Sequence, residues 1–279
     1  MPVRIVTDSA ADLSDAETSE LGIEVVPLSI RFGDEEYTDR VDLSVAEFYD
    51  KMADLDVLPE TAAPSPGAFE AVFRKLVDEG ADEIVCINLS LALSATGQAA
   101  QSAAKAVSDL VPVTCVDSKS ITGGLGTMVI AAARAAAEGA SAAEIVALAE
   151  ELIPRTHVFG VLDTLDNLKK GGRIGNAQAL LGTMLSIKPC LDLSSGEVEE
   201  AGKQRTRKKA LAWLKTVVES AGDVEQLAVI HGHAPDIDSF LDSIADVVPR
   251  DKIRVSELGA VIGTHGGPRV VGVCYLTKA

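Results

Sequence analysis

With 279 residues, of which 47% are hydrophobic and 24% charged, the chain has the length and composition of one large or two medium globular domains. A formal net charge of −17 repels nucleic-acid backbones, and an aromatic content of only 4% offers few platforms for stacking bases, so both argue against a nucleic-acid binder. No apolar run is long enough to span a membrane and no signal-peptide pattern opens the sequence, so we expect a cytoplasmic protein without stable membrane insertion.

Short apolar strands alternate with helices through the first half of the chain, and capping signals mark the helix starts. The expected strands cover residues 3–9, 23–32, 82–90 and 111–118, and a turn at 33–37 leads from the second of them into another extended segment. The expected helices begin near Ser14, Ser44, Ser65, Thr96, Gly123 and Ser141, the second of them covering 44–55. This alternation predicts a parallel sheet with helices on both faces, a three-layer α/β/α arrangement.

Polar segments follow three of these strands. They are TDS at 7–9, LSLALSATG at 89–97 and VDSKSITGG at 116–124. All three would lie at the carboxyl ends of parallel strands, which is the edge where open α/β sheets bind ligands.

The pattern changes after Pro154, which ends the last of these helices. The following sequence mixes strands, hairpin turns and two basic segments, and ends with apolar runs around 226–231, 252–258 and 269–277. We therefore predict two domains, an N-terminal α/β domain over 1–154 and a C-terminal α+β domain with a mixed sheet over 155–279.

The four cysteines are isolated in apolar runs and form no C-x-x-C motif. They are Cys86, Cys115, Cys190 and Cys274. Such residues are typical of small buried strand positions in a reducing compartment.

Three polar residues have positions that suit an anion. Thr61 precedes a proline-punctuated loop, where its hydroxyl either points into a cleft or bonds its own backbone. Ser94 lies just before the helix start at Thr96, where it either caps the helix or helps its N–H groups to bind a carboxylate or phosphate. His265 lies in GTHGGP, which we interpret as a flexible loop that can approach a ligand closely, with the imidazole as a hydrogen-bond donor.

Other chemically capable residues favour structural roles. Asp8 and Asp117 follow strands, but no D-x-D pair accompanies Asp8, so turn capping is preferred to magnesium binding. His231 and His233 could share one side of a strand end, but no third or fourth zinc ligand is placed nearby in the sequence. We expect no metal site, and the absence of a P-loop and of G-x-S-x-G leaves no predicted catalytic residue.

Two segments, LKKGGRIG and GKQRTRKKA, concentrate positive charge in this acidic chain. They hold eight of the 25 lysines and arginines: Lys169, Lys170, Arg173, Lys203, Arg205, Arg207, Lys208 and Lys209. The concentration indicates either a docking patch for an anion or acidic partner, or a solvated helix face.

Several motifs in one order resemble the DegV family of bacterial fatty-acid-binding proteins, and they extend over nearly the whole chain. They are VTDSAADL at the start, Thr61 with PSPG, LSLALSAT, VDSKSITGG, LDNLKKGGRI, IKPCL, RTRKKAL and ELGAVIGTHGGP. The resemblance implies two α/β domains enclosing a long apolar tunnel, with one fatty acid held by its carboxylate between them. It assigns Thr61, Ser94 and His265 to the carboxylate, and Arg173 and Arg205 to a surface facing a partner or a phosphate.

The implied function is that of a carrier without catalysis or cofactor, which binds a long-chain fatty acid and presents its carboxylate to a separate fatty acid kinase for acyl-phosphate formation. The alternative is a stand-alone phosphotransferase or esterase acting on an acyl substrate through Ser94 or Asp8. Five positions depart from the family pattern around the expected site: Ala62, Ala63, Leu91, Ala95 and Arg269.

Overall fold

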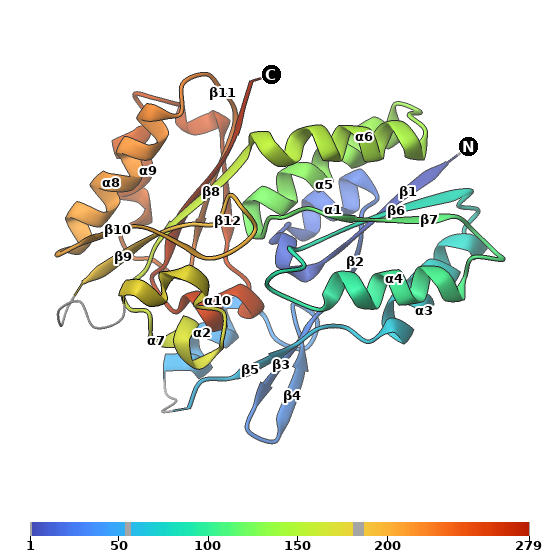
Figure 1. The fold of residues 1–279 in the computed structure, drawn as a ribbon, viewed down its shortest axis with the longest axis horizontal. Helices are drawn as coiled ribbons and strands as arrows, with labels where there is room; N and C mark the ends of the chain where they lie inside the picture. Colours follow the sequence, from blue (N-terminus) through green and yellow to red (C-terminus); the bar gives the residue numbers. More distant parts are fainter. Residues whose placement is uncertain (1, 54–56, 181–186, 279) are drawn as a thin grey trace.

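The computed structural model describes residues 2–53, 57–180 and 187–278, and over these residues the strands form three sheets (Figure 1). The first is entirely parallel, in the order β2-β1-β6-β7. Its strands are β1 (Val3–Asp8), β2 (Glu24–Val26), β6 (Glu83–Asn88) and β7 (Val113–Asp117). The parallel sheet predicted from the sequence is confirmed.

Helices cover both faces of this sheet (Figure 1). On one face lie α3 (Pro66–Asp78) and α4 (Thr96–Ala106), and on the other α1 (Asp15–Leu21), α5 (Thr122–Ala137) and α6 (Ala142–Leu152). Alternating residues of β6 pack into hydrophobic cores on opposite faces of the sheet. Ile84 and Cys86 pack on the α3–α4 side, and Val85 and Ile87 pack on the α5 side. The three-layer arrangement is therefore also confirmed.

The helix starts follow the predicted caps. Ser14, Ser65 and Ser141 each accept a hydrogen bond from a backbone N–H in the first turn of their helix, and Ser44 does the same for α2 (Val45–Ala53). The last two residues of the helix expected over 44–55 lie outside the described residues.

A small antiparallel sheet, in the order β4-β3-β5, projects below the parallel one in Figure 1. Its strands are β3 (Ser29–Phe32), β4 (Glu35–Thr38) and β5 (Glu60–Ala62). Thr61 precedes the proline-punctuated loop, as expected, and its backbone joins this sheet opposite Ile30. The extended run expected at 23–32 is divided between two sheets, with Pro27 between its strands.

The second half forms a six-stranded mixed sheet in the order β10-β9-β8-β13-β11-β12, as predicted. Its strands are β8 (Thr156–Val161), β9 (Lys188–Asp192), β10 (Glu199–Gln204), β11 (Val224–His231), β12 (Ile253–Glu257) and β13 (Val271–Thr277). Only β11 and β12 run parallel among its neighbouring pairs. One face carries α8 (Arg207–Ser220) and α9 (Ile237–Ile244), and α5 packs on the other (Figure 1).

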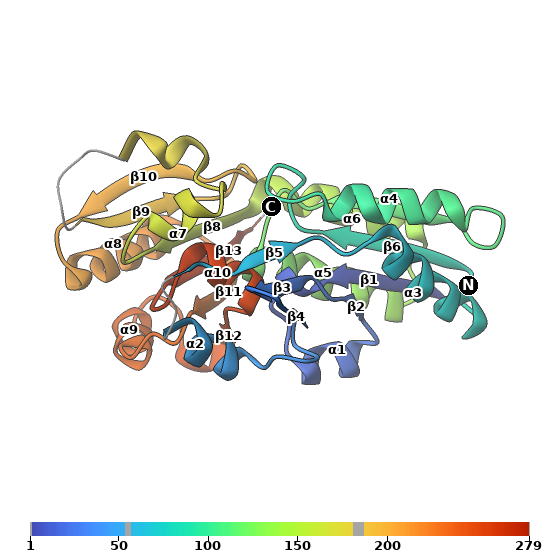
Figure 2. The same cartoon turned by 90° about the horizontal axis from the view of Figure 1, so that it is seen from below.

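The parallel and mixed sheets lie side by side and share a core (Figure 2). Ile87 of β6, Leu125 of α5 and Ile230 of β11 belong to one cluster of buried side chains. The division into 1–154 and 155–279 follows the sheets and remains a proposal, because α5 contacts both of them. No helix among the described residues is both long and apolar enough to cross a bilayer.

Candidate functional site

A cavity of about 950 Å³, part of it open to solvent, lies between the two large sheets. Most of its lining side chains are aliphatic, and they come from both halves of the chain, for example Leu89, Ile121, Leu162 and Ile230. Its few polar lining residues include Thr61, Ser94, Arg173 and His265. The fold thus brings together four residues that lie far apart in the sequence.

A polar contact at this site joins Thr61 to His265. The Thr61 Oγ1 lies 2.9 Å from the His265 Nε2, within hydrogen-bonding distance. A threonine hydroxyl accepts and donates at the same time, so Thr61 can accept a bond from the imidazole N–H and still donate its own proton to a ligand oxygen.

His265 belongs to a helix rather than to the flexible loop predicted from GTHGGP. It lies in the last turn of α10 (Ala260–Gly266), which ends at Gly267 with a positive φ of 82°. Gly263, the first residue of that predicted loop, also lies inside α10. A side chain there would begin 2.7 Å from the hydroxyl of Tyr49, so Gly263 permits close packing against α2.

The imidazole of His265 is held neutral. Burial lowers the pKa of His265 to about 4, and the nearby positive charge of Arg173 acts in the same direction. The ring also packs tightly on Gly171, where a Cβ atom would lie 2.2 Å from Nδ1. At neutral pH the ring therefore contributes hydrogen bonding and a fixed orientation rather than a charge.

Ser94 and Arg173 lie on two segments that contact each other. Ser94 Oγ lies 2.8 Å from Thr96 Oγ1 and accepts a bond from the N–H of Thr96, the first residue of α4, and it also lines the cavity. Arg173 follows α7 (Asp166–Lys170), and its Nε donates to the carbonyl of Leu93 at 3.2 Å. This contact brings a guanidinium next to the residue before Ser94.

A second, more polar cleft of about 1000 Å³ adjoins the cavity. The two share Thr61, Arg173 and His265, and the cleft is also lined by Lys170 and Glu60. The polar end of the cavity therefore lies at its mouth, beside two positive charges.

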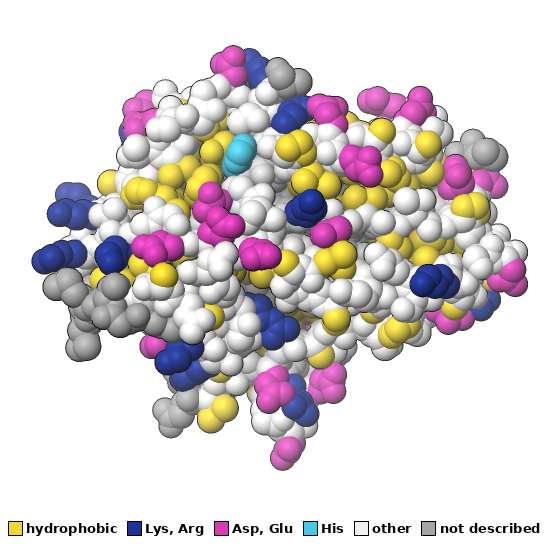
Figure 3. Space-filling view, in the orientation of Figure 1, with side chains coloured by type: hydrophobic (Ala, Val, Ile, Leu, Met, Phe, Trp, Pro, Cys, Tyr) yellow, Lys and Arg dark blue, Asp and Glu magenta, His cyan; other side chains and the backbone are white. Residues whose placement is uncertain are grey.

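Arg205 lies apart from this mouth and lines neither space. It is exposed between β10 and α8, where Figure 3 shows basic side chains gathered along the left margin. Its neighbour Arg207 forms an ion pair with Asp236, in which two guanidinium nitrogens donate to the carboxylate at 2.9 Å each. The basic segments thus combine structural ion pairs with exposed charge.

The departures from the family pattern are distributed unevenly around the site. Ala62 and Ala63 line the cavity, whereas Leu91 and Ala95 do not. Arg269 turns away from it and pairs with Asp163, with 3.5 Å between Nε and Oδ2, in a left-handed backbone conformation with φ of 62°. Arg269 therefore adds no charge to the lining.

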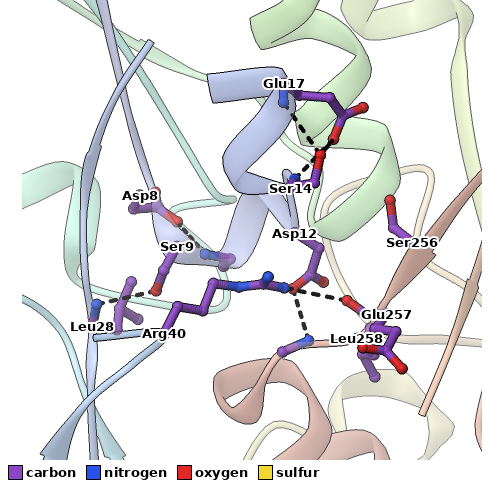
Figure 4. A network of polar contacts seen from close by, with 12 residues as sticks. Asp8, Ser9, Asp12, Ser14, Glu17, Leu28, Arg40, Ser256, Glu257 and Leu258 are labelled. Carbon is purple, nitrogen blue, oxygen red and sulfur yellow. Dashed lines mark hydrogen bonds and ion pairs between the residues drawn. The ribbon is translucent and has the colours of Figure 1, made fainter. Parts of the chain in front are cut away.

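A buried network fixes α10, and with it His265, against the N-terminal half (Figure 4). Asp12 accepts bonds from the N–H of Gly259, at the start of α10, and from the Arg40 guanidinium at 2.8 and 2.9 Å. Arg40 also donates to the carbonyl of Glu257. On the other side of the helix, Asn167 Nδ2 donates to the carbonyl of Thr264 at 3.0 Å.

Asp39 adjoins this network and makes stability depend on pH. It is 1% exposed, and burial raises its pKa from 3.8 to about 6, although hydrogen bonds with Ser9 and Ala260 and the charge of Arg40 act in the opposite direction. The folded state therefore holds a proton that the unfolded state has lost, so this residue reduces stability as the pH rises from about 4 to 6.

We predict that Asp39→Asn raises the free energy of unfolding at pH 7.5 by on the order of 1 to 3 kcal/mol, with little effect at pH 4. Urea unfolding at both pH values measures this, with the exposed Asp34→Asn as control. A loss of stability at pH 7.5 would contradict the prediction and show that attraction between Asp39 and Arg40 outweighs the cost of burial.

The remaining sequence candidates take structural positions. Asp8 accepts from the N–H groups of Ala10 and Leu89, and Asp117 from those of Leu91 and Lys119, as turn capping predicts. No group of three or more residues suited to a metal occurs in the part of the chain that the structure describes. Sequence reasoning missed the Asp12–Arg40 network and the packing of Gly171 on His265, because both depend on contacts between distant segments.

Comparison with known proteins agrees with this arrangement. The family model described as "Uncharacterised protein, DegV family" matches residues 2–278. A DegV domain-containing protein of Streptomyces coelicolor is 41% identical over 283 residues, covering 99% of both chains. A fatty-acid-binding DegV family protein of Thermus thermophilus superposes with a TM-score of 0.91 at 34% identity over 100% of both chains. A stearic-acid-binding protein of Eubacterium ventriosum gives 0.89 at 26% identity, covering 99% of this chain and 98% of that one. The chain belongs to the DegV family.

Proposed function

We propose that this protein binds a long-chain fatty acid, with the acyl chain in the cavity and the carboxylate at Thr61, Ser94 and His265. The observation that carries the proposal is the contact between Thr61 and His265 at the polar mouth of a mostly aliphatic cavity. The relatives from Thermus thermophilus and Eubacterium ventriosum, which bind fatty acids, support it.

The free energy of binding can be considered separately for the acyl chain in the aliphatic cavity and for the carboxylate at the polar mouth. Burial of fourteen methylene groups at about 0.8 kcal/mol each gives a gross gain on the order of 11 kcal/mol, enough to offset ordering costs. A carboxylate without partners would be expensive to bury, so the hydroxyls of Thr61 and Ser94 provide the donors that it needs. His265, neutral at pH 7, then orients Thr61.

Native mass spectrometry of the protein purified from bacteria tests this function. We expect a bound species with the mass of a long-chain fatty acid, and a rise in melting temperature when such an acid is added to the delipidated protein. If neither is seen, the proposal is wrong.

We further propose that the carrier acts in the cytoplasm and presents the carboxylate to a fatty acid kinase for acyl-phosphate formation. The cleft at the mouth, with Lys170 and Arg173, would expose the carboxylate beside positive charge that suits an incoming phosphate. An esterase or phosphotransferase acting by itself gains no support, since Ser94 pairs with Thr96, His265 pairs with Thr61, and Asp8 does not line the cavity.

Charge reversal at Arg205 tests fatty-acid binding separately from presentation of the carboxylate to the kinase. Because Arg205 is exposed and lines neither space, Arg205→Glu should leave fatty-acid affinity unchanged and lower the rate of kinase-dependent phosphorylation at least tenfold. Phosphate transfer from ATP to the loaded carrier by a purified fatty acid kinase provides the measurement. Arg74→Glu, on α3, is the control, and equal rates in both variants would remove Arg205 from the docking surface.

A further inference from the structure

Two of the four cysteines, far apart in the sequence, are direct neighbours in the parallel sheet. Cys86 on β6 and Cys115 on β7 are register partners, and both side chains lie on the face covered by α3 and α4. They look isolated in the sequence, because only the pairing of β6 with β7 brings them together. Both are free thiols in this structure.

The two thiols lie in different environments, which gives them different reactivity towards oxidants. Cys86 is fully buried, and burial raises its pKa well above the usual value, whereas Cys115 is partly exposed on β7, the edge strand of the sheet. The neighbouring Cys86 thiol lowers the pKa of Cys115. Oxidants attack the more accessible thiol with greater thiolate character, and this is Cys115.

The spacing of the strands allows a bond between the two sulfurs. Neighbouring strands lie about 4.8 Å apart, and disulfides join Cα atoms roughly 4.4 to 6.8 Å apart. Because the two side chains stand parallel on adjacent strands, their sulfur atoms must move closer together to form the bond. β7 pairs with another strand on one side only. A disulfide formed under such strain is readily reduced again, as reversible redox sites require.

We propose that Cys86 and Cys115 form a reversible redox site that a small hydroperoxide converts into an intramolecular disulfide. The Cys115 thiolate attacks the terminal peroxide oxygen, the O–O bond breaks, and Cys115 becomes a sulfenic acid as hydroxide leaves from hydrogen peroxide, or an alkoxide from an organic hydroperoxide. The Cys86 sulfur then attacks the Cys115 sulfur, an S–S bond forms, and water leaves with the proton of the Cys86 thiol. In total, two thiols are oxidised and one hydroperoxide is reduced.

The experiment treats the reduced full-length protein with a small excess of hydrogen peroxide, blocks the remaining thiols with N-ethylmaleimide, and maps the peptides by mass spectrometry. We expect one cross-link, between Cys86 and Cys115, with loss of two hydrogens and reversal by dithiothreitol. The buried Cys190 and Cys274 serve as internal controls and should react at least tenfold more slowly.

Two variants give the proposal a second test. Cys86→Ser should leave a sulfenic acid at Cys115 that dimedone traps, and Cys115→Ser should show neither cross-link nor trapped adduct at Cys86. Oxidation of wild-type protein to sulfinic acid without the cross-link, disulfides between molecules only, or equal reactivity of all four cysteines would overturn the proposal. None of these outcomes depends on the lipid ligand, so the proposed function is tested separately.

Discussion

Replacement of Thr61 by valine should weaken fatty-acid binding by about 10- to 100-fold while the fold is retained. Valine keeps the shape and the strand preference of threonine on β5 but removes the hydroxyl that contacts His265 Nε2 at 2.9 Å. A hydrogen bond to a charged group contributes roughly 1.5 to 3 kcal/mol, and each 1.4 kcal/mol changes affinity about tenfold. The loss follows because the carboxylate would then face a methyl group.

Titration of delipidated protein with a long-chain fatty acid measures this effect. Thr114→Val is the matched control, since Thr114 is an exposed residue on β7 that lies away from the cavity. Ser94→Ala should cause a similar but independent loss through the second donor. If Thr61→Val binds as tightly as the control, the carboxylate does not lie at Thr61.

Substitution of Gly160 by valine should shorten the acyl chain that the protein accepts. Gly160 on β8 and Gly272 on β13 are register partners and both line the cavity, so together they leave a stretch of wall without side chains. A Cβ at Gly160 would meet no atom closer than 3.9 Å, so a side chain there fills ligand space without distorting the sheet. Displacement of three or four methylenes at about 0.8 kcal/mol each would reduce the affinity for the longest chains roughly 50- to 200-fold.

Competition among saturated fatty acids of increasing length tests this prediction. We expect the variant to lose affinity for the longest chains and to keep it for shorter ones, whereas Ala201→Val, on β10 and away from the cavity, should behave as the wild type. A uniform loss over all lengths would show that the wall at Gly160 does not contact the end of the acyl chain.

The sequence predicted what depends on local patterns. Capping residues such as Ser14 and Ser141 marked helix starts correctly, and apolar runs marked the strands of both large sheets. The polar segments after β1, β6 and β7 do lie at one edge of the parallel sheet, as their order in the sequence implied. These features need only the few residues on either side of each position.

What the sequence could not predict depends on pairing between distant segments. The strand that holds Thr61 was not predicted, because β5 has only three residues and its partner Ile30 lies in a hairpin formed much earlier in the chain. His265 looked like a loop residue because glycines surround it, yet contacts from Tyr49, Asp12 and Asn167 hold that segment as a helix. Tertiary contacts overrode the low helix propensity of glycine there.

The residues shared by the cavity and the cleft bear on the order in which the two ends of a fatty acid enter and leave. Thr61, Arg173 and His265 border both spaces. For a fatty acid bound as proposed, the methyl end must pass these polar residues first and the carboxylate must arrive last. Binding is then complete only when the carboxylate reaches its hydrogen-bond donors. A partner protein docked at the mouth would therefore contact the carboxylate of each fully bound fatty acid.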